Sequence, residues 1–438
     1  MLRRNFIKSG SLVAGGFFMA PKPVFAFNND IINIAVLGTG WWGTEILLAS
    51  ILKTTQFDVI GICDVNAAAL QNAAAQVEKA GRKKPALFSN YEEMYNMPGL
   101  EAVVIATPTH WHPLQFIAAC NKGLHVFLEK PISYDIREGQ AMVKAQQKAG
   151  NVVQVDFPRV MTDSNQKVKT IIESGALGKI FQVQANIHNE EGGLVEKAIP
   201  ANFDFETFCG PAPRTKFLCN ENGDKPDWRA QHDFSRGIMA DWGIHYIHNV
   251  RRILQLDIPT NVSAIGGLVR NVTQDNPDQL DVRYDFDGLP VYWSHKAWGY
   301  KAPDPDRNIG VYYYGDKATL FAGDLGWELY TEDGKKQTTG DMRFTPGAPD
   351  VIPIYEKMIS DLFTEFAAGI RKKSNAGITN TLAEAQKTTS TVIYGDMAYR
   401  LKSNLVIDPK TMDIKDNPAA QALLSRAYRK PFVHPWNK

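Results

Sequence analysis

Two stretches that lie far apart in the sequence carry side chains suited to proton transfer. Lys130 is the middle residue of the sequence EKP and follows an apolar run, whereas Asp241 and His245 stand four residues apart in the sequence DWGIH. Residues four apart lie on one face of a helix, so Asp241 could orient the imidazole of His245. A histidine with a pKa near neutrality is a reasonable general base, and partial burial of Lys130 would lower its pKa toward proton transfer.

Each of these features also has a purely structural interpretation. A lysine at the end of a strand is often a solvated surface charge, and Asp241 with His245 could form a buried structural hydrogen bond. His248, one turn after His245, adds the option of a metal site. We predict no metal, because no carboxylate or histidine triad with established metal spacing accompanies these residues.

A glycine-rich turn near the N-terminus suggests a nucleotide site. The apolar run 31–37 ends in GTGWWG (38–43), which has the GxGxxG spacing. In such a turn Gly38 permits the tight bend, Gly40 lets the backbone approach a pyrophosphate, and Gly43 lets the next helix pack on the strand. The N–H groups at the start of that helix would face the phosphates. The alternative is a nucleotide fold that has lost its ligand.

Asp64 supplies the second feature expected of a dinucleotide-binding fold. It ends the apolar strand FDVIGICD (57–64), 26 positions after Gly38. An acid at the end of the second strand can accept hydrogen bonds from a ribose diol and would repel a 2′-phosphate. The pattern therefore predicts a nicotinamide dinucleotide as cofactor, with NAD favoured over NADP.

The elements that would position these residues follow a regular alternation up to residue 157. Strands are expected at 33–37, 58–63, 86–88, 102–106, 124–128 and 152–157, and helices near 43–54, 66–80, 112–122 and 135–149. Repeated βα units imply a doubly wound parallel sheet, that is, an α/β Rossmann domain over residues 31–157. The carboxyl ends of its strands would bear ATPTHWH (106–112) and EKP, where ligands bind in such sheets.

After residue 157 the pattern changes. Strand-like runs between 261 and 331 with turn signals suggest an antiparallel sheet, and two helices at about 353–371 and 380–400 close the chain. We predict a C-terminal α+β domain over 158–438 with a large, mainly antiparallel open sheet. The segment 188–236 shows little regular pattern.

Composition narrows the choice of partners. The chain of 438 residues is 44% hydrophobic and 22% charged, with a formal net charge of +1. Nothing in this balance suggests nucleic acid as a partner. Cys209 and Cys219 lie ten apart in a loop-rich stretch, and the sequence leaves open whether they form a disulfide.

The first 26 residues have the features of an export signal. RRNFIK (3–8) precedes a short apolar segment, and VFA (24–26) ends in a small-residue cleavage pattern. The arginine pair resembles the twin-arginine signal of bacteria, which exports folded proteins. We predict a periplasmic protein that carries its dinucleotide out tightly bound and has no membrane segment after processing. An uncleaved membrane anchor is the alternative.

These motifs together resemble the Gfo/Idh/MocA family of sugar oxidoreductases. The matching segments are GTGWWG, Asp64, ATPTHWH, GLHVFLEKP (123–131), IIESGALGKIFQV (171–183) and DWGIH. In addition, FCGPAPRTKF (208–217) and LLSRAYRKPFV (423–433) resemble a subgroup of exported bacterial members. The resemblance implies a substrate-binding second domain whose open sheet often mediates dimers or tetramers, with catalysis between the domains.

The resemblance also implies roles for individual residues. Lys130 would hydrogen-bond the reacting hydroxyl, His245 would take its proton as general base, and Asp241 would orient substrate and His245. His112 would lie near the nicotinamide or the substrate. The cofactor would be held by Gly38, Thr39, Gly40, Trp41, Trp42, Gly43 and Asp64, with Thr107, Pro108, Glu129 and Lys130 beside it. The tryptophan pair departs from the small residues often found there and could clamp the cofactor.

The predicted function is an NAD-dependent oxidoreductase that acts on a hydroxyl of a sugar or glycoside. Two alternatives remain open on the sequence. One is a glycosidase or lyase that works through a transient keto sugar, as in glycoside hydrolase family 109, and the other is a non-catalytic carbohydrate-binding protein. The presence of Lys130 favours net redox chemistry. With His245 as base, the rate should rise with its deprotonation at roughly pH 5–8.

Overall fold

The structure is a computed structural model that describes residues 31–188, 193–270, 273–296, 307–339 and 351–437. The predicted export signal, residues 1–26, lies outside the described residues. Residues 31–438 form one compact unit, so the boundary predicted at residue 157 stays a prediction.

The first sheet has six strands in the order β3-β2-β1-β4-β5-β6, and every neighbouring pair is parallel. This order reverses at β1, as in a doubly wound fold, and confirms the predicted Rossmann sheet. β4 is buried along its whole length, which is why its sequence is continuously apolar. The strands are β1 (Ile32–Leu37), β2 (Phe57–Cys63), β3 (Ala86–Phe88), β4 (Ala102–Ile105), β5 (His125–Glu129) and β6 (Val153–Asp156).

The connecting helices begin where the sequence supplies capping residues. Asn66 accepts hydrogen bonds from the first turn of α2 (Ala67–Lys79), and Asp135 with Glu138 forms a capping box at the start of α5 (Ile136–Ala149). The helix expected over 43–54 is wound as a π-helix, η1 (Trp42–Leu48), before the short α1 (Ala49–Leu52). The other connections are α3 (Tyr91–Met94), η2 (Thr109–Trp111) and α4 (His112–Asn121).

The second sheet has ten strands in the order β16-β15-β14-β13-β7-β12-β11-β10-β17-β18. Only the β7–β12 pair is parallel, which confirms the mainly antiparallel sheet. The strands are β7 (Ile180–His188), β10 (Asn261–Gly267), β11 (Gln279–Phe286), β12 (Leu289–Lys296), β13 (Ile309–Gly315), β14 (Ala318–Ala322), β15 (Trp327–Thr331), β16 (Lys336–Thr339), β17 (Leu405–Ile407) and β18 (Ile414–Lys415).

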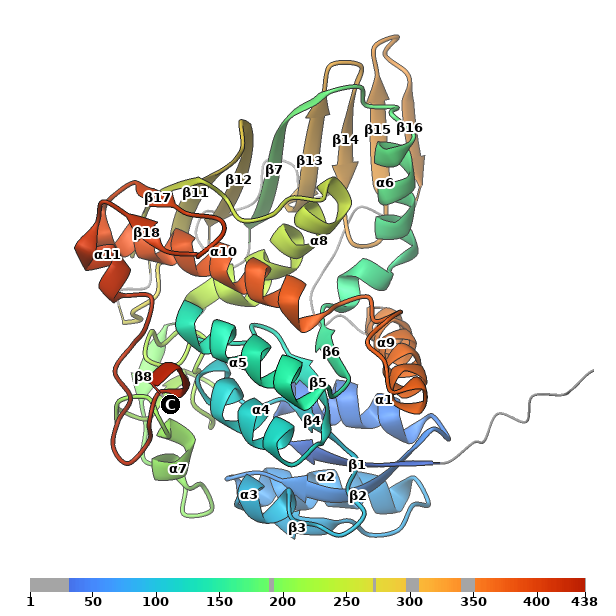
Figure 1. Cartoon of the computed structure of the whole chain (residues 1–438), viewed down its shortest axis with the longest axis vertical. Coiled ribbons are helices and arrows are strands. Elements are labelled where there is room, and N and C mark those ends of the chain that lie inside the picture. The colour runs from blue at the N-terminus through green and yellow to red at the C-terminus, as the bar shows by residue number, and fades with distance from the viewer. Residues whose placement is uncertain (1–30, 189–192, 271–272, 297–306, 340–350, 438) are drawn as a thin grey trace, which may run out of the picture. The chain divides into compact units, whose positions relative to one another are not determined.

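Helices cover one face of this sheet (Figure 1). α6 (Asp163–Glu173) packs on β14 and α8, and α10 (Leu382–Leu401) packs on β10, β11 and α8 (Ile244–Leu254). α8 continues from the π-helix η4 (Met239–Gly243), while η3 (Pro158–Met161) joins β6 to α6. Alternation along β13 turns Tyr312 and Tyr314 to the other face, and Ile265 of β10 is 75% exposed there.

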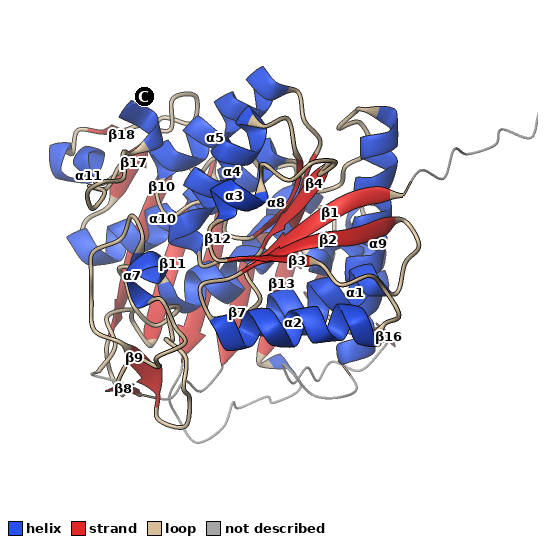
Figure 2. Ribbon diagram, turned by 90° about the horizontal axis from the view of Figure 1, so that it is seen from below, coloured by secondary structure: helices blue, strands red, loops and turns tan. Residues whose placement is uncertain are grey.

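The long helix α9 (Ile352–Lys372) returns to the first sheet. Its Phe363 stacks on Phe127 of β5, with ring centroids 4.3 Å apart, and meets Phe57 of β2 edge-on at 5.7 Å. α9 also contacts α1, beside which it lies in Figure 2. Both closing helices predicted from the sequence are therefore present, and α9 ties the end of the chain to the Rossmann sheet.

The segment 188–236 contains more structure than its sequence indicates. β8 (Leu194–Glu196) pairs with β9 (Leu218–Asn220), and α7 (Phe205–Cys209) belongs to a small aromatic core with Phe217 and Phe234. Cys209 and Cys219 are buried in that core as free thiols. The last elements are α11 (Pro418–Ala422) and η6 (Pro435–Asn437).

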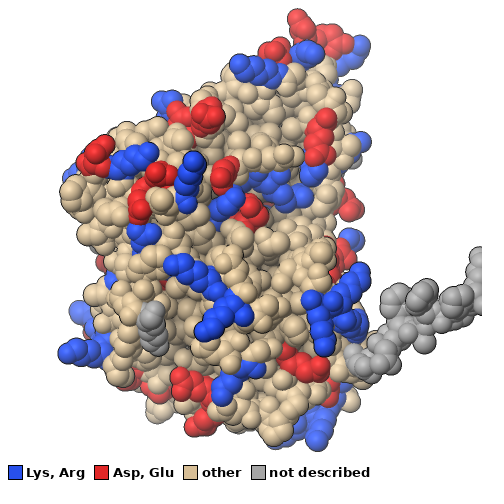
Figure 3. Space-filling view, in the orientation of Figure 1, with Lys and Arg blue, Asp and Glu red and all other residues tan. Residues whose placement is uncertain are grey.

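Among the described residues, no helix is both long and apolar enough to cross a bilayer. Acidic and basic side chains are interspersed on the face shown in Figure 3, and neither charge forms a continuous patch there.

Candidate functional site

The glycine turn has the geometry that the motif requires. Gly38 has φ +92°, and a Cβ there would lie 2.7 Å from the Ala106 carbonyl. A Cβ on Gly43 would lie 2.1 Å from the Gly38 oxygen, so this position needs glycine for packing. A Cβ on Gly40, in contrast, would have no neighbour within 4 Å. Gly40 therefore leaves its backbone open to a ligand.

A cavity of about 1000 Å³ opens over this turn. Of the predicted cofactor residues, Gly38, Gly40, Trp41, Trp42, Gly43, Asp64, Thr107 and Pro108 line it. Its volume suits a dinucleotide, and the start of η1 supplies N–H groups for a pyrophosphate. The residues present thus fit NAD.

Hydrogen bonds fix the orientation of the Asp64 carboxylate at the wall of this cavity. One carboxylate oxygen accepts hydrogen bonds from the Thr39 backbone N–H at 2.6 Å and from the Thr39 hydroxyl at 2.9 Å. The other accepts from the Asn66 N–H at 2.8 Å. Thr39 itself is buried and does not line the cavity, so it positions Asp64. A fixed carboxylate at this place favours a ribose diol over a 2′-phosphate.

Lys130 and Asp241 meet across the interface between the two sheets. The Lys130 ammonium donates to the Asp241 carboxylate at 2.8 Å and to the Asp241 backbone carbonyl at 2.7 Å. Arg229 approaches the same carboxylate oxygen at 3.1 Å. Burial alone would raise the pKa of Asp241, but the two cations hold it well below its usual range. Lys130 is thus a fixed, partly buried ammonium rather than a solvated surface charge.

His245 is buried one turn along the same helix, next to this pair. Its Nδ1 has no hydrogen-bond partner among the described residues, and no hydrogen bond joins it to Asp241. Burial, with the charges of Arg159 and Lys130, lowers the pKa of His245 well below 6.5. His245 is therefore neutral at pH 7 and able to accept a proton, and Asp241 serves Lys130 instead of orienting this ring.

Behind Lys130 lies a pair of buried carboxyl groups. Glu129 and Asp156 are register neighbours on β5 and β6, and each has one oxygen without a hydrogen-bond partner among the described residues. Burial raises the pKa of both groups, and the Asp156 charge raises that of Glu129 further. The Trp42 indole donates to the second Asp156 oxygen at 2.9 Å. Glu129 does not line the cavity, so the pair lies behind Lys130 rather than at the cavity wall.

Two histidines have structural positions. The ring nitrogens of His112 each lie 2.7 Å from a carbonyl oxygen, one of Thr107 and one of Pro131. His112 thus ties the TPTHWH turn to the EKP turn from beneath and does not line the cavity. His248 contacts Thr388 at 3.0 Å and Asn380 at 3.2 Å, so its ring is already engaged away from Asp241.

Sequence reasoning missed three contributors to this region. Arg229 lines the cavity and reaches Asp241, so it connects the cavity wall to the Lys130 pair. Asp156 is the last residue of β6 and the acid in the predicted strand VVQVDF, so it could have been noted as a second acid at a strand end. Phe432 lines the cavity from the end of the chain. It belongs to the matching segment LLSRAYRKPFV, but that resemblance assigned no role to this residue.

The fold and the cavity define a dinucleotide-binding protein of the α/β oxidoreductase class. Residues 32–157 match the family model described as oxidoreductase family, NAD-binding Rossmann fold, and residues 161–276 match that family's C-terminal alpha/beta domain. The chain belongs to the Gfo/Idh/MocA family and carries its NAD-binding domain.

Curated relatives share part of the chain. A glycosyl hydrolase family 109 protein from Stenotrophomonas maltophilia is 23% identical over 54% of this chain and 51% of its own length. An inositol 2-dehydrogenase from Salmonella typhimurium is 26% identical over 36% of this chain and 46% of its own length. The chain thus spans about half the length of the curated relatives it matches.

Solved structures match the fold over most of the chain. An oxidoreductase from Agrobacterium radiobacter in complex with NAD⁺, L-tartaric acid and magnesium has a TM-score of 0.67 at 17% identity, over 87% of this chain and 99% of its own. A levoglucosan dehydrogenase in complex with NADH and levoglucosan has a TM-score of 0.64 at 17% identity, over 86% and 99%. At this identity the likeness concerns the fold.

Proposed function

We propose that this protein oxidises a hydroxyl-bearing carbon of a carbohydrate and passes the hydride to a tightly held NAD. The observation that carries the proposal is the Lys130–Asp241 contact at 2.8 Å. This contact joins a fixed ammonium at the carboxyl end of β5 to the helix that carries the buried His245, and it supports a shared role for the two side chains. The names of the inositol and levoglucosan dehydrogenases support a carbohydrate substrate.

Each side chain has a definite task in this proposal. Lys130 donates to the reacting oxygen and stabilises the negative charge that grows on it. The neutral His245 takes the hydroxyl proton, while Asp241 and Arg229 fix the Lys130 ammonium. Bound NAD supplies the hydride acceptor. The C–H bond and the O–H bond are broken, and a carbonyl group forms on the substrate.

The test uses purified mature protein and a panel of sugars and glycosides without free nucleotide. We expect the near-ultraviolet absorbance of reduced nicotinamide to rise with a substrate. A flat absorbance together with free aglycone would instead support redox-assisted glycoside cleavage. This is the second candidate function, and the similarity to a glycosyl hydrolase family 109 protein favours it. If a sugar binds but is recovered chemically unchanged, with neither an absorbance rise nor free aglycone, the result would support a carbohydrate-binding protein.

We also propose that residues 1–26 direct export by the twin-arginine route to the periplasm. The arginine pair and the small-residue cleavage pattern support this. Replacement of Arg3 and Arg4 by lysine should abolish export of the protein, as measured by cell fractionation, while an unaltered signal exports it.

We further propose a dimer or tetramer formed through the open face of the second sheet. The exposed Ile265 and the stacked pair of Tyr312 and Tyr314, 5.8 Å apart, lie on that face. Light scattering during gel filtration should give a mass that is a multiple of the monomer, and Tyr312→Lys should shift it to the monomer.

A further inference from the structure

The last described residues, 423–437, return to the NAD cavity, where Phe432 forms part of the wall. We call this segment the C-terminal strap. Figure 1 shows the C-terminus beside α5 and close to β8, on the side of α7. The strap follows α11, and its final turn η6 contacts α5.

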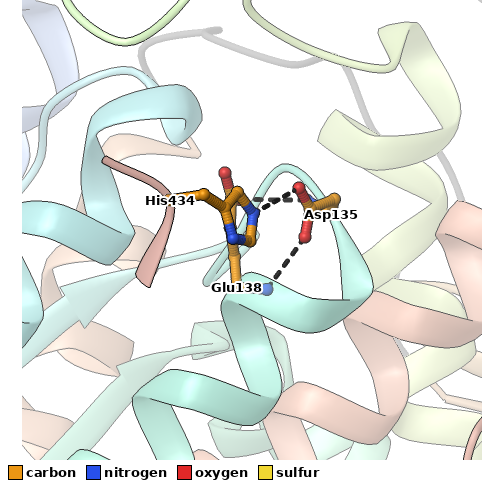
Figure 4. A group of neighbouring side chains, drawn as sticks. All are labelled: Asp135, Glu138 and His434. Carbon is orange, nitrogen blue, oxygen red and sulfur yellow. Dashed lines mark hydrogen bonds and ion pairs between the residues drawn. The ribbon is translucent and has the colours of Figure 1, made fainter. Parts of the chain in front are cut away.

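Both ends of the strap are anchored on buried carboxylates at the start of α5, of which Figure 4 shows the contact with His434. One Asp135 oxygen accepts from the Arg426 backbone N–H and faces the His434 Nε2, both at 3.0 Å. Tyr428 donates its hydroxyl to Glu138 at 2.6 Å. Because the capping box uses the remaining carboxylate oxygens, this cluster has its donors within the protein and serves as an anchor rather than as a metal site.

The middle of the strap is anchored on α7. The Arg429 side chain donates to the Gly210 carbonyl at 3.0 Å and to the Glu206 carbonyl at 3.1 Å, and it pairs with the Glu206 carboxylate. The Arg429 backbone N–H donates to the Pro211 carbonyl at 2.9 Å. The segment from 426 to 434 is therefore held on both sides.

Between these anchors, Phe432 enters the wall of the NAD cavity. Its ring meets Trp111 edge-on at 5.3 Å, and Trp111 meets Tyr91 edge-on at 5.9 Å. Tyr91 follows β3, which lies beyond β2 and Asp64 in the sheet order. This aromatic row therefore stands on the adenosine side of the cavity, since Asp64 marks the position of the adenosine ribose.

We propose that the strap closes the adenosine half of the cavity through Phe432 and so sets the rate at which NAD leaves. The inference rests on the proposed function, in which the cofactor is tightly held. A dinucleotide could leave past this wall only after Phe432 withdraws, and withdrawal requires the anchors at Asp135, Glu138 and α7 to open.

The test measures release of bound NADH, from its fluorescence, after a chase with excess ADP-ribose. Phe432→Ala removes a large apolar ring from the wall and should speed release at least about tenfold. Phe432→Leu retains part of the side-chain volume, so its NADH release rate should lie between those of the parent protein and Phe432→Ala. Val433→Ala is the matched control, because Val433 is the next strap residue, is 49% exposed and does not line the cavity.

The outcomes separate the two proposals. Equal release rates in the parent protein and Phe432→Ala would overturn the role of the strap. If the parent protein is purified without nucleotide, tight retention in the proposed function fails, while NADH added to both proteins still reveals whether Phe432 slows release. Should Phe432→Ala fail to fold, as judged by its melting curve, Phe432→Leu and Arg429→Met decide, and both should release NADH faster than Val433→Ala.

Discussion

At the scale of single residues, Lys130 is the side chain on which the proposed chemistry depends. Lys130→Met removes the ammonium and leaves Asp241 paired with Arg229, 3.1 Å away. We expect kcat to fall by about 10²–10⁴ with the NAD content unchanged. Lys122→Met, at an exposed lysine that bonds Asn96, is the matched control. Full activity in Lys130→Met would remove this residue from the mechanism.

His245 makes a second prediction at this scale, which concerns the pH–rate profile. Because burial and neighbouring cations lower its pKa well below 6.5, the acid limb of kcat/KM should lie at a lower pH than an ordinary histidine gives. The rate should rise as the pH increases through that lowered pKa and be level above about pH 6.5. An initial-rate profile checks this, and a limb centred near neutrality would argue for another base.

Trp42 and Trp41 form a natural pair for testing the buried carboxyl groups. Trp42→Phe keeps a six-membered aromatic ring but removes the pyrrole half of the indole, and with it the N–H that donates to Asp156, a fully buried side chain. The lost donor should reduce the free energy of unfolding by about 1–3 kcal/mol, as measured in urea. Trp41, 54% exposed, should tolerate the same replacement within about 0.5 kcal/mol. Equal effects would show that the indole N–H is unimportant.

At the scale of elements, two glycines of the same turn have different roles, Gly43 in the stability of the fold and Gly40 in NAD binding. Gly43→Ala places a methyl group 2.1 Å from the Gly38 oxygen, so the turn or η1 must shift, at a cost of about 1–3 kcal/mol. Gly40→Ala meets nothing within 4 Å and should fold normally. Its methyl group would occupy space for the pyrophosphate, so we expect at least about tenfold weaker NAD binding. Calorimetry of unfolding and of NAD binding compares the two variants.

The π-helical turns belong to this scale as well. η1 begins at Trp42 in the glycine turn, and η4 holds Asp241 just before His245. The helix expected over 43–54 and the helix that carries Asp241 and His245 thus both begin with a wider π-helical turn at the residues that form the site. Such local π-helices occur often at functional sites, where they redirect side chains.

For the whole molecule, buried histidines predict sensitivity to acid. Burial lowers the pKa of His110 and His248 to about 3 and of His295 to about 4, and it lowers that of His245 as well. The unfolded chain takes up these protons near pH 6.5, whereas the folded protein does not. Stability should therefore fall as the pH drops from about 6.5 toward 4.

Melting temperatures across this pH range check the prediction. Below about pH 4 the loss should steepen, because Asp241 and Asp396 have lowered pKa values in the folded state and must be protonated on unfolding. The raised pKa values of Glu129 and Asp156 act in the opposite direction and reduce this loss, so a melting temperature that stays constant between pH 7 and 5 would contradict a dominant contribution from the histidines.

The sequence by itself determined the NAD-binding turn, Asp64, the six strands of the first sheet and the mainly antiparallel character of the second. These features follow from local patterns: alternation, apolar runs, and glycine spacing within a few residues. It also identified Lys130, Asp241 and His245 as candidates, because motif and helical spacing are local too.

Only the tertiary structure decided how those residues pair. Lys130 and Arg229 both use Asp241, so His245 stands apart from it. The Asp156–Trp42 bond and the C-terminal strap likewise join residues more than a hundred positions apart. Such contacts depend on how the two sheets and the end of the chain pack together, and no local pattern records that packing.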